Sequence, residues 1–287
     1  MSDRRYFTAA LLALVVLAWL ALIVWGQSPY ARFLHHEEIG QLKLGLNIDD
    51  PFLTLVFVAG WTVMTVAMML PTSLPLFTLF QRLVRRRQDA PRLVALLIGG
   101  YVVIWSLFGL AAHVADHGVH AAVEQVAWLQ DNSWVIGAAT LLLAGVYQFT
   151  PLKYICLDKC RSPLSFITEH WHGSHERAEA FKLGLHHGAF CVGCCWSLML
   201  LMFAVGVGNV GWMLLLGTIM ATEKNMPWGR RISAPLGAAL VAAAVARAGI
   251  AAAFVALLVH TLMYAAFLED PLAWVLLGAG IGLVRRP

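Results

Sequence analysis

The stretch LGLHHGAFCVGCCWSLMLLMFA, residues 183–204, is apolar enough to cross a lipid bilayer, yet it carries five metal-ligand side chains within ten residues. These are two imidazoles and three thiols: His186, His187, Cys191, Cys194 and Cys195. A run of about twenty apolar residues matches a hydrocarbon core of roughly 30 Å. Ionisable groups at such a depth are costly, so they indicate a functional site.

The rest of the chain is of the same kind. Of its 287 residues, 60% are hydrophobic and 13% are charged, whereas soluble domains are about 25% charged. We therefore predict an integral protein of the lipid bilayer. Membrane backbone must satisfy its own hydrogen bonds, and no alternating strand pattern is present, so we expect an all-α, polytopic transmembrane helix bundle of about seven to nine helices. The basic residues form short clusters beside apolar runs, which argues against nucleic-acid binding.

Apolar runs predict six spans in the first part of the chain: residues 6–25, 52–80, 93–112, 134–152, 183–205 and 212–222. The first follows MSDRR and lacks a small-residue cleavage site, so we interpret it as a retained anchor. Pro71 should kink the second span, because proline removes a backbone hydrogen bond.

Basic residues between spans predict the topology. The densest basic segment, QRLVRRRQDAPR at 81–92, should lie in the cytoplasm together with the N-terminus. Residues 153–182 and 223–231 then also lie in the cytoplasm, and the acidic segment 26–51 and the segment 113–133 lie outside.

The C-terminal part leaves two arrangements open. Residues 232–268 are too long for one span, and we expect a break at Arg247–Gly249. Either three further spans follow residue 231, or residues 234–247 lie along the membrane interface. We divide the chain into an N-terminal anchor with its exterior loop (1–52), a metal-binding membrane-helix core (53–248) and a C-terminal transmembrane extension (249–287).

Helical geometry gathers the soft donors of the fifth span. At 100° per residue, His187, Cys191 and Cys194 fall within about 60° of one another, with Cys195 at the edge. The cysteines lie roughly 12–18 Å deep. Thiolates at this depth need a compensating cation, and a bound metal supplies one. Buried cysteine can also be a small packing residue, but three within five residues favour a metal site.

The second span offers further soft donors. Met64 and Met68 are four residues apart on one helix face, whereas Met69 lies off that face. Thioethers, thiolates and imidazole together favour Cu(I), and zinc is the next choice. We expect Met64 or Met68 to complete the site of the fifth span, although methionine also fills apolar cores.

Two further sets of ligands flank this site. Cys156 and Cys160 lie at the cytoplasmic end of the fourth span, and the nearby Lys153, Lys159 and Arg161 should lower their thiol pKa. We expect this pair to act in metal release or exchange. On the exterior side, a secondary site for Cu(II) or zinc would use three histidines at helical spacing: His113, His117 and His120.

Four motifs carry a resemblance to a known family: WTVMTVAMMLPTSLP, YQFTPLKYICLDKCRSP, GLHHGAFCVGCCWSLMLLMFAVG and EKNMPWG. Over about residues 53–245 the chain resembles a bacterial family of unknown function, described as predicted metal-binding integral membrane proteins and sometimes labelled copper chaperones. The resemblance implies a multi-helix fold in the inner (cytoplasmic) membrane and a link to metal, without an established reaction. It maps the family's motif residues onto Met64, Met68, Met69, Pro71, Cys156, Cys160, His187, Cys191, Cys194, Cys195, Glu223 and Lys224.

We therefore expect this protein to bind a soft metal, most of all copper, within the membrane and to transfer or transport it. A soluble or membrane protein would act as metal donor or acceptor, and we do not expect catalysis. The chain has no nucleotide-binding motif of an ATP-driven pump. The alternative is a membrane thiol–disulfide oxidoreductase, which could be linked to a quinone and would use one of the cysteine pairs. Haem ligation by His187 and His260 is a third and weaker reading.

The topology can be tested by cysteine labelling. In intact cells, a membrane-impermeant maleimide should leave Cys156 and Cys160 unlabelled, because the charge bias places both on the cytoplasmic side. Labelling should occur once the cells are permeabilised. Efficient labelling from outside would show that the predicted orientation is inverted.

Overall fold

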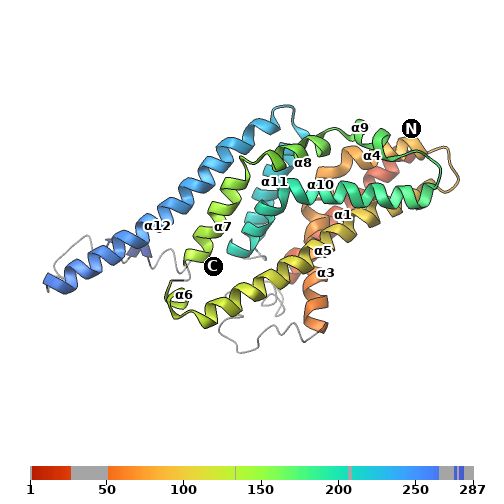
Figure 1. Ribbon diagram of the computed structural model, residues 1–287. Coiled ribbons are helices and arrows are strands. Elements are labelled where there is room, and N and C mark those ends of the chain that lie inside the picture. Colours follow the sequence, from red (N-terminus) through yellow and green to blue (C-terminus); the bar gives the residue numbers. More distant parts are fainter. Residues whose placement is uncertain are drawn as a thin grey trace.

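The computed structural model describes residues 2–26, 51–132, 134–205, 209–264, 275–276 and 278–280. Its regular elements are helices (Figure 1), so the prediction of an all-α chain is confirmed. Most of the predicted exterior segment 26–51, much of the C-terminal extension and the side chain of His260 lie outside the described residues.

Length and apolar composition identify candidate membrane spans among these helices. Four are long and apolar enough to cross a bilayer: Phe7–Gly26, Ala90–Gln125, Glu176–Met202 and Gly229–Leu257. The number rises to six if each of two bent helix pairs forms one span. The predicted spans all coincide at least in part with helices, while the total of seven to nine stays a prediction.

The first bent pair follows the N-terminal helix α1 (Ser2–Gly26) and contains Pro71. Helix α3 (Pro51–Met68) and the segment from the 3₁₀ turn η2 (Pro71–Ser73) through α4 (Leu74–Val84) meet at an angle of 46°. The predicted kink is confirmed. Met69 lies at the break between the two helices. Its carbonyl oxygen accepts hydrogen bonds from two side chains, the Thr72 hydroxyl at 2.8 Å and the Tyr101 hydroxyl at 3.2 Å. The kink is thus stabilised by the side chains of Thr72 and Tyr101, which also lie at the candidate metal-binding site described below.

Helix α5 (Ala90–Gln125) is longer than the sequence suggested. It contains the predicted third span, 93–112, and continues through residues 113–125 of the predicted exterior segment 113–133. The reason is local: residues 113–125 contain no proline and are rich in alanine and other residues that tolerate a helix. A short helix, α6 (Ala127–Asp131), follows.

Helix α10 (Glu176–Val205) carries the thiols and packs closely against α5 (Figure 1). Glycines permit the approach. A Cβ atom on Gly184 would collide with the Leu97 carbonyl oxygen, and one on Gly100 would collide with the Phe181 carbonyl oxygen. Small residues at a helix crossing bring two backbones together in this way. The contact aligns Tyr101 of α5 with the thiols of α10.

The second bent pair brings two more cysteines to α10. Helix α7 (Trp134–Tyr147) and α8 (Pro151–Arg161) meet at 64°. Thr150 caps α8, since its hydroxyl accepts a hydrogen bond from the Lys153 amide at 3.4 Å, and Pro151 occupies the first turn. Helix α9 (Pro163–His170) then leads back to α10.

The C-terminal helices correct one expectation. After α11 (Val210–Asn225) and the turn η3 (Gly229–Ile232), helix α12 runs from Ser233 to Tyr264 in one piece, so the predicted break at Arg247–Gly249 is wrong. Alanine-rich sequence on both sides sustains the helix across Gly249. Arg247 does not end the helix, because its side chain lies against Gly137 of α7: a Cβ there would be 2.6 Å from the guanidinium.

The close packing of α5 on α10 can be tested with neighbouring glycines. Gly100→Ala should lower the stability of the detergent-solubilised protein by about 1–3 kcal/mol, because the new methyl group has no room. Gly99→Ala is the matched control, since a Cβ at that position would have no neighbour within 4 Å, and it should be neutral or stabilising by up to about 1 kcal/mol. Equal shifts in thermal melting would contradict the close contact.

Candidate metal-binding site

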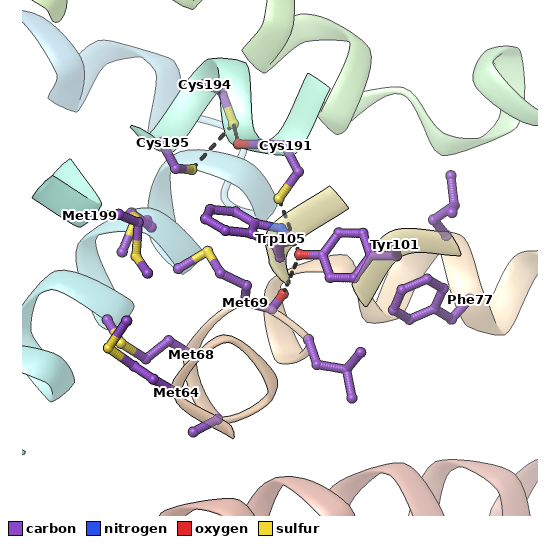
Figure 2. Close-up of a cluster of buried hydrophobic side chains, with 14 of the residues drawn as sticks. Met64, Met68, Met69, Phe77, Tyr101, Trp105, Cys191, Cys194, Cys195 and Met199 are labelled. Carbon is purple, nitrogen blue, oxygen red and sulfur yellow. Dashed lines mark hydrogen bonds between the residues drawn. The ribbon is translucent and has the colours of Figure 1, made fainter. Parts of the chain in front are cut away.

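Four thiols from two helices meet in the interior. Cys191, Cys194 and Cys195 lie within two turns of α10 and are almost fully buried. The Cys194 sulfur is 3.2 Å from that of Cys195 and 3.9 Å from that of Cys160 on α8. Cys160 also neighbours Cys191. We call Cys160, Cys191, Cys194 and Cys195 the thiol cluster; Figure 2 shows its three members on α10.

The two cysteines of α8 therefore differ from each other. Cys160 was expected to lie apart from the fifth-span site, but it touches Cys194 while keeping part of its side chain accessible. Cys156 is buried against α10, where its sulfur would be 2.6 Å from a Cβ on Gly193. All five cysteines are free thiols. Cys160 thus connects the buried sulfurs to the surface.

The Cys191 sulfur has a charged partner. The Lys224 ammonium group of α11 donates a hydrogen bond to it at 2.9 Å and another to the Thr72 hydroxyl at 3.2 Å. The Tyr101 hydroxyl lies 3.1 Å from the same sulfur. An ammonium group favours negative charge on a neighbouring sulfur. Lys224 is therefore placed to compensate a negative charge on Cys191.

His187 lies one helical turn before Cys191 and is also buried. Its Nε2 atom is 3.1 Å from the Ser73 hydroxyl, and its ring stacks on Tyr101 at a centroid distance of 5.7 Å. Among the described residues, its Nδ1 atom has no hydrogen-bond partner. A buried ring nitrogen without a partner is unusual, and a neutral imidazole nitrogen is a good ligand for copper or zinc.

The predicted methionines lie in the same buried core as the thiols. Met64 and Met68 are 1% and 3% exposed. In the view of Figure 2, Met69 and Met199 lie between the cysteines and this pair. Met69 was expected to point away, but α3 ends at Met68 and the kink turns the next residue toward α10.

The cations of α8 do not surround its cysteines as expected. Lys153 is buried and pairs with the Glu223 carboxylate of α11 at 2.8 and 3.0 Å. Lys159 donates a hydrogen bond to Glu169 at 2.6 Å and lowers the pKa of that carboxyl. Arg161 donates to the Glu223 carbonyl oxygen. Their proximity to the cysteines along the chain was misleading, because adjacent residues of a helix point in different directions.

The three predicted exterior histidines share α5 but differ in surroundings. His113 is buried and stacks on Phe57 of α3 at a centroid distance of 4.5 Å. His120 is exposed, and its Nδ1 atom lies 2.9 Å from the Asp116 carbonyl oxygen. His117 is half-buried between them along the helix. A metal site at these residues stays a prediction.

Within the part of the chain that the structure describes, no group of three or more His, Cys, Asp or Glu side chains is arranged to hold a metal ion. The thiol cluster shows why. Cys191 faces Tyr101 and Lys224, whereas the Cys194 thiol donates to the Cys191 carbonyl oxygen at 3.1 Å. The sulfurs adjoin without converging on one point, so binding an ion would require rotation of these side chains.

Comparison with known protein families identifies the family to which the chain belongs. A family model described as "Copper chaperone" matches residues 58–247, which is more than half of the chain. The chain belongs to the copper chaperone family. No curated protein and no solved structure was found to match it. The matched region of this copper chaperone family member includes the whole thiol cluster, the α3 methionines and Lys224.

Reasoning from the sequence missed some of the residues around the site in this copper chaperone family member. Tyr101 and Ser73 were not singled out, and Lys224 entered only through the family motif. Two signals were available. A tyrosine inside an apolar span must find a partner for its hydroxyl group, and a lysine at the end of a span must pair or reach water. Neither signal names the partner, because the partner lies on another helix.

The Lys224 contact leads to a prediction about thiol reactivity. In the metal-free protein, Lys224→Met should slow alkylation of Cys191 by a membrane-permeant maleimide by roughly tenfold, since the thiolate loses its charge partner. Lys159→Met is the control, because that ammonium group pairs with Glu169 instead. Site-resolved mass spectrometry would measure both rates. An unchanged rate in Lys224→Met would mean that the ammonium does not act on this sulfur.

Proposed function

We propose that this protein binds Cu(I) in the membrane through the thiol cluster and transfers it to a partner protein. The observation that carries the proposal is the contact between sulfurs of two helices, in which the Cys194 sulfur lies 3.9 Å from that of Cys160 and 3.2 Å from that of Cys195. Membership of the copper chaperone family supports copper as the cargo. The soft sulfur donors favour Cu(I) over harder ions, with zinc as the next candidate.

The proposed ligands are Cys191, Cys194 and Cys195, with His187 as a further donor through its unpartnered Nδ1 atom. Lys224 compensates the Cys191 charge while the site is empty. When Cu(I) binds, one further thiol of the cluster releases its proton and balances the charge of the ion, while Lys224 keeps its contacts with Cys191 and Thr72. The site can thus fill and empty without leaving an isolated thiolate in an apolar environment.

Transfer would proceed by exchange of sulfur ligands. Cys160 touches Cys194 and is partly accessible, so Cu(I) could move from the buried thiols to Cys160 and then to a thiol of the partner. The charge bias of the sequence predicts that this end lies in the cytoplasm. We therefore propose a soluble or membrane-bound acceptor that presents its own soft ligands on the cytoplasmic side of the inner membrane.

A thiol–disulfide oxidoreductase is the second candidate, and one observation favours it. Cys160 and Cys194 come from different helices, and their sulfurs are 3.9 Å apart, so a modest movement could join them in a disulfide. The two functions differ in what the purified protein contains. Copper or zinc at about one ion per chain supports metal handling, whereas a metal-free protein with a titratable disulfide supports redox chemistry.

The central test removes two thiols. In detergent-purified protein, Cys191→Ser and Cys194→Ser should each weaken Cu(I) affinity by at least about tenfold, equivalent to about 1.4 kcal/mol, because a hydroxyl group is a poor ligand for Cu(I). Affinity should also fall as the pH is lowered, since protons compete for the thiolates. Elemental analysis and competition with a Cu(I) chelator would measure these effects.

Cys156→Ser is the matched control for this test. Its sulfur packs against Gly193, so the change should leave the copper stoichiometry near that of the unaltered protein. A Cys191→Ser, Cys194→Ser double variant that still bound Cu(I) with unaltered affinity would overturn the proposed function. The thiols of α10 would then be packing residues.

A further inference from the structure

The face of α10 that carries the thiols continues as methionines. Met199 and Met202 lie four and seven residues after Cys195, which places them on the same side of the helix. Both are fully buried at 0% exposure. From Cys191 to Met202 this stripe of soft donors extends about 16 Å along the helix. It therefore reaches well beyond the thiol cluster.

Helix α11 presents a matching face. Met213, Gly217, Met220 and Lys224 recur at intervals of three or four residues and so share one side of the helix. One end of this face touches α10, through the 2.9 Å contact of Lys224 with Cys191. Its middle touches α3, where a Cβ on Gly217 would lie 3.7 Å from the Met68 methyl carbon. Met220, at 0% exposure, lies between these two contacts.

Helix α3 closes the arrangement. Met64 lies one turn before Met68 on the same face, and both belong to the buried core that contains the thiols. In the view of Figure 2, Met199 lies between Cys195 and the pair formed by Met64 and Met68. Each of the three helices therefore contributes a pair of buried methionines. We call Met64, Met68, Met199, Met202, Met213 and Met220 the methionine path.

Thioether ligands are better suited to binding Cu(I) transiently during transfer than to retaining it tightly. Methionine is neutral, so it can contact Cu(I) in an apolar core without the cost of an uncompensated thiolate. Its unbranched side chain also changes rotamer easily. Methionine fills cores for that same reason, but packing alone does not require that the pairs line up with the thiol face on three helices.

We infer that the methionine path is a second soft-metal site, which binds Cu(I) or Ag(I) through thioethers alone and extends from the thiol cluster toward the C-terminal end of α10 and the N-terminal end of α11. This inference rests on the proposed function in that it takes a soft monovalent ion as the cargo. It assigns to Met64 and Met68 a site of their own rather than completion of the thiol site.

The experiment uses the full-length protein, purified in detergent with selenomethionine in place of methionine and loaded with Cu(I). X-ray absorption at the copper edge should show copper–selenium scattering, which ligation by a methionine side chain produces, and the variants below assign it to the methionine path. The Met68→Leu, Met199→Leu, Met220→Leu triple variant should lose that signal and about one bound Ag(I) per chain. Met226→Leu, at a position 44% exposed, should change neither measurement.

The Cys191→Ser, Cys194→Ser variant separates this inference from the proposed function. It should keep the copper–selenium signal while losing the thiol-bound ion. Absence of the signal in the fully loaded unaltered protein would overturn the methionine path and leave the thiol site untouched. A triple variant that melted like Met226→Leu and kept its Ag(I) stoichiometry would overturn it as well. A double variant that kept both the selenium signal and its full thiol-bound copper would instead overturn the proposed function alone.

Discussion

The contact between the Lys224 ammonium group and the Cys191 sulfur, 2.9 Å long, is the interaction on which the site depends. A charge or a thiolate in an apolar core is unfavourable unless a partner compensates it. Lys224 and Cys191 compensate each other, and they do so across two helices. The same ammonium group reaches Thr72, beside the kink that Pro71 produces. One charged contact thereby links α10, α11 and the broken second span.

Glu223, the residue before Lys224 on α11, also compensates a buried charge, but on a different side of the helix. Its carboxylate accepts hydrogen bonds from the buried Lys153 of α8 and, at 2.6 Å, from the Ser233 hydroxyl at the start of α12. Adjacent residues of a helix point about 100° apart. Glu223 therefore contacts α8 while its neighbour Lys224 contacts α10. Removing either partner would strand a buried charge. The end of α11 is consequently anchored on both the α8 and the α10 side.

The sequence predicted the parts of this structure that depend on one helix. The kink at Pro71 follows from a missing backbone donor, and the common face of His187, Cys191 and Cys194 follows from helical periodicity. The parts that depend on two helices were out of reach. The glycines at 100 and 184 set how closely α5 approaches α10, and only that approach brings Tyr101 to Cys191. Cys160 was placed apart for the same reason: the 64° bend before α8 turns it toward Cys194. In α12 the sequence suggested a break that does not exist. Arg247 interrupts an apolar run, but the helix continues because the arginine side chain packs against Gly137 of α7.

These contacts bear on the proposed choice of ion, because they would favour a soft monovalent ion over a harder divalent one. With Lys224 beside it, a Cys191 thiolate is already neutralised, so the empty site carries no net charge that would draw water or a hard cation into the core. A Cu(I) ion adds one positive charge, which one further thiolate in the cluster can balance. A divalent ion would require two, or the departure of the ammonium group from a position where it has few other partners. In the proposed site the soft donors would select the ion by bonding, and the buried ammonium group of Lys224 would reinforce that selection through charge.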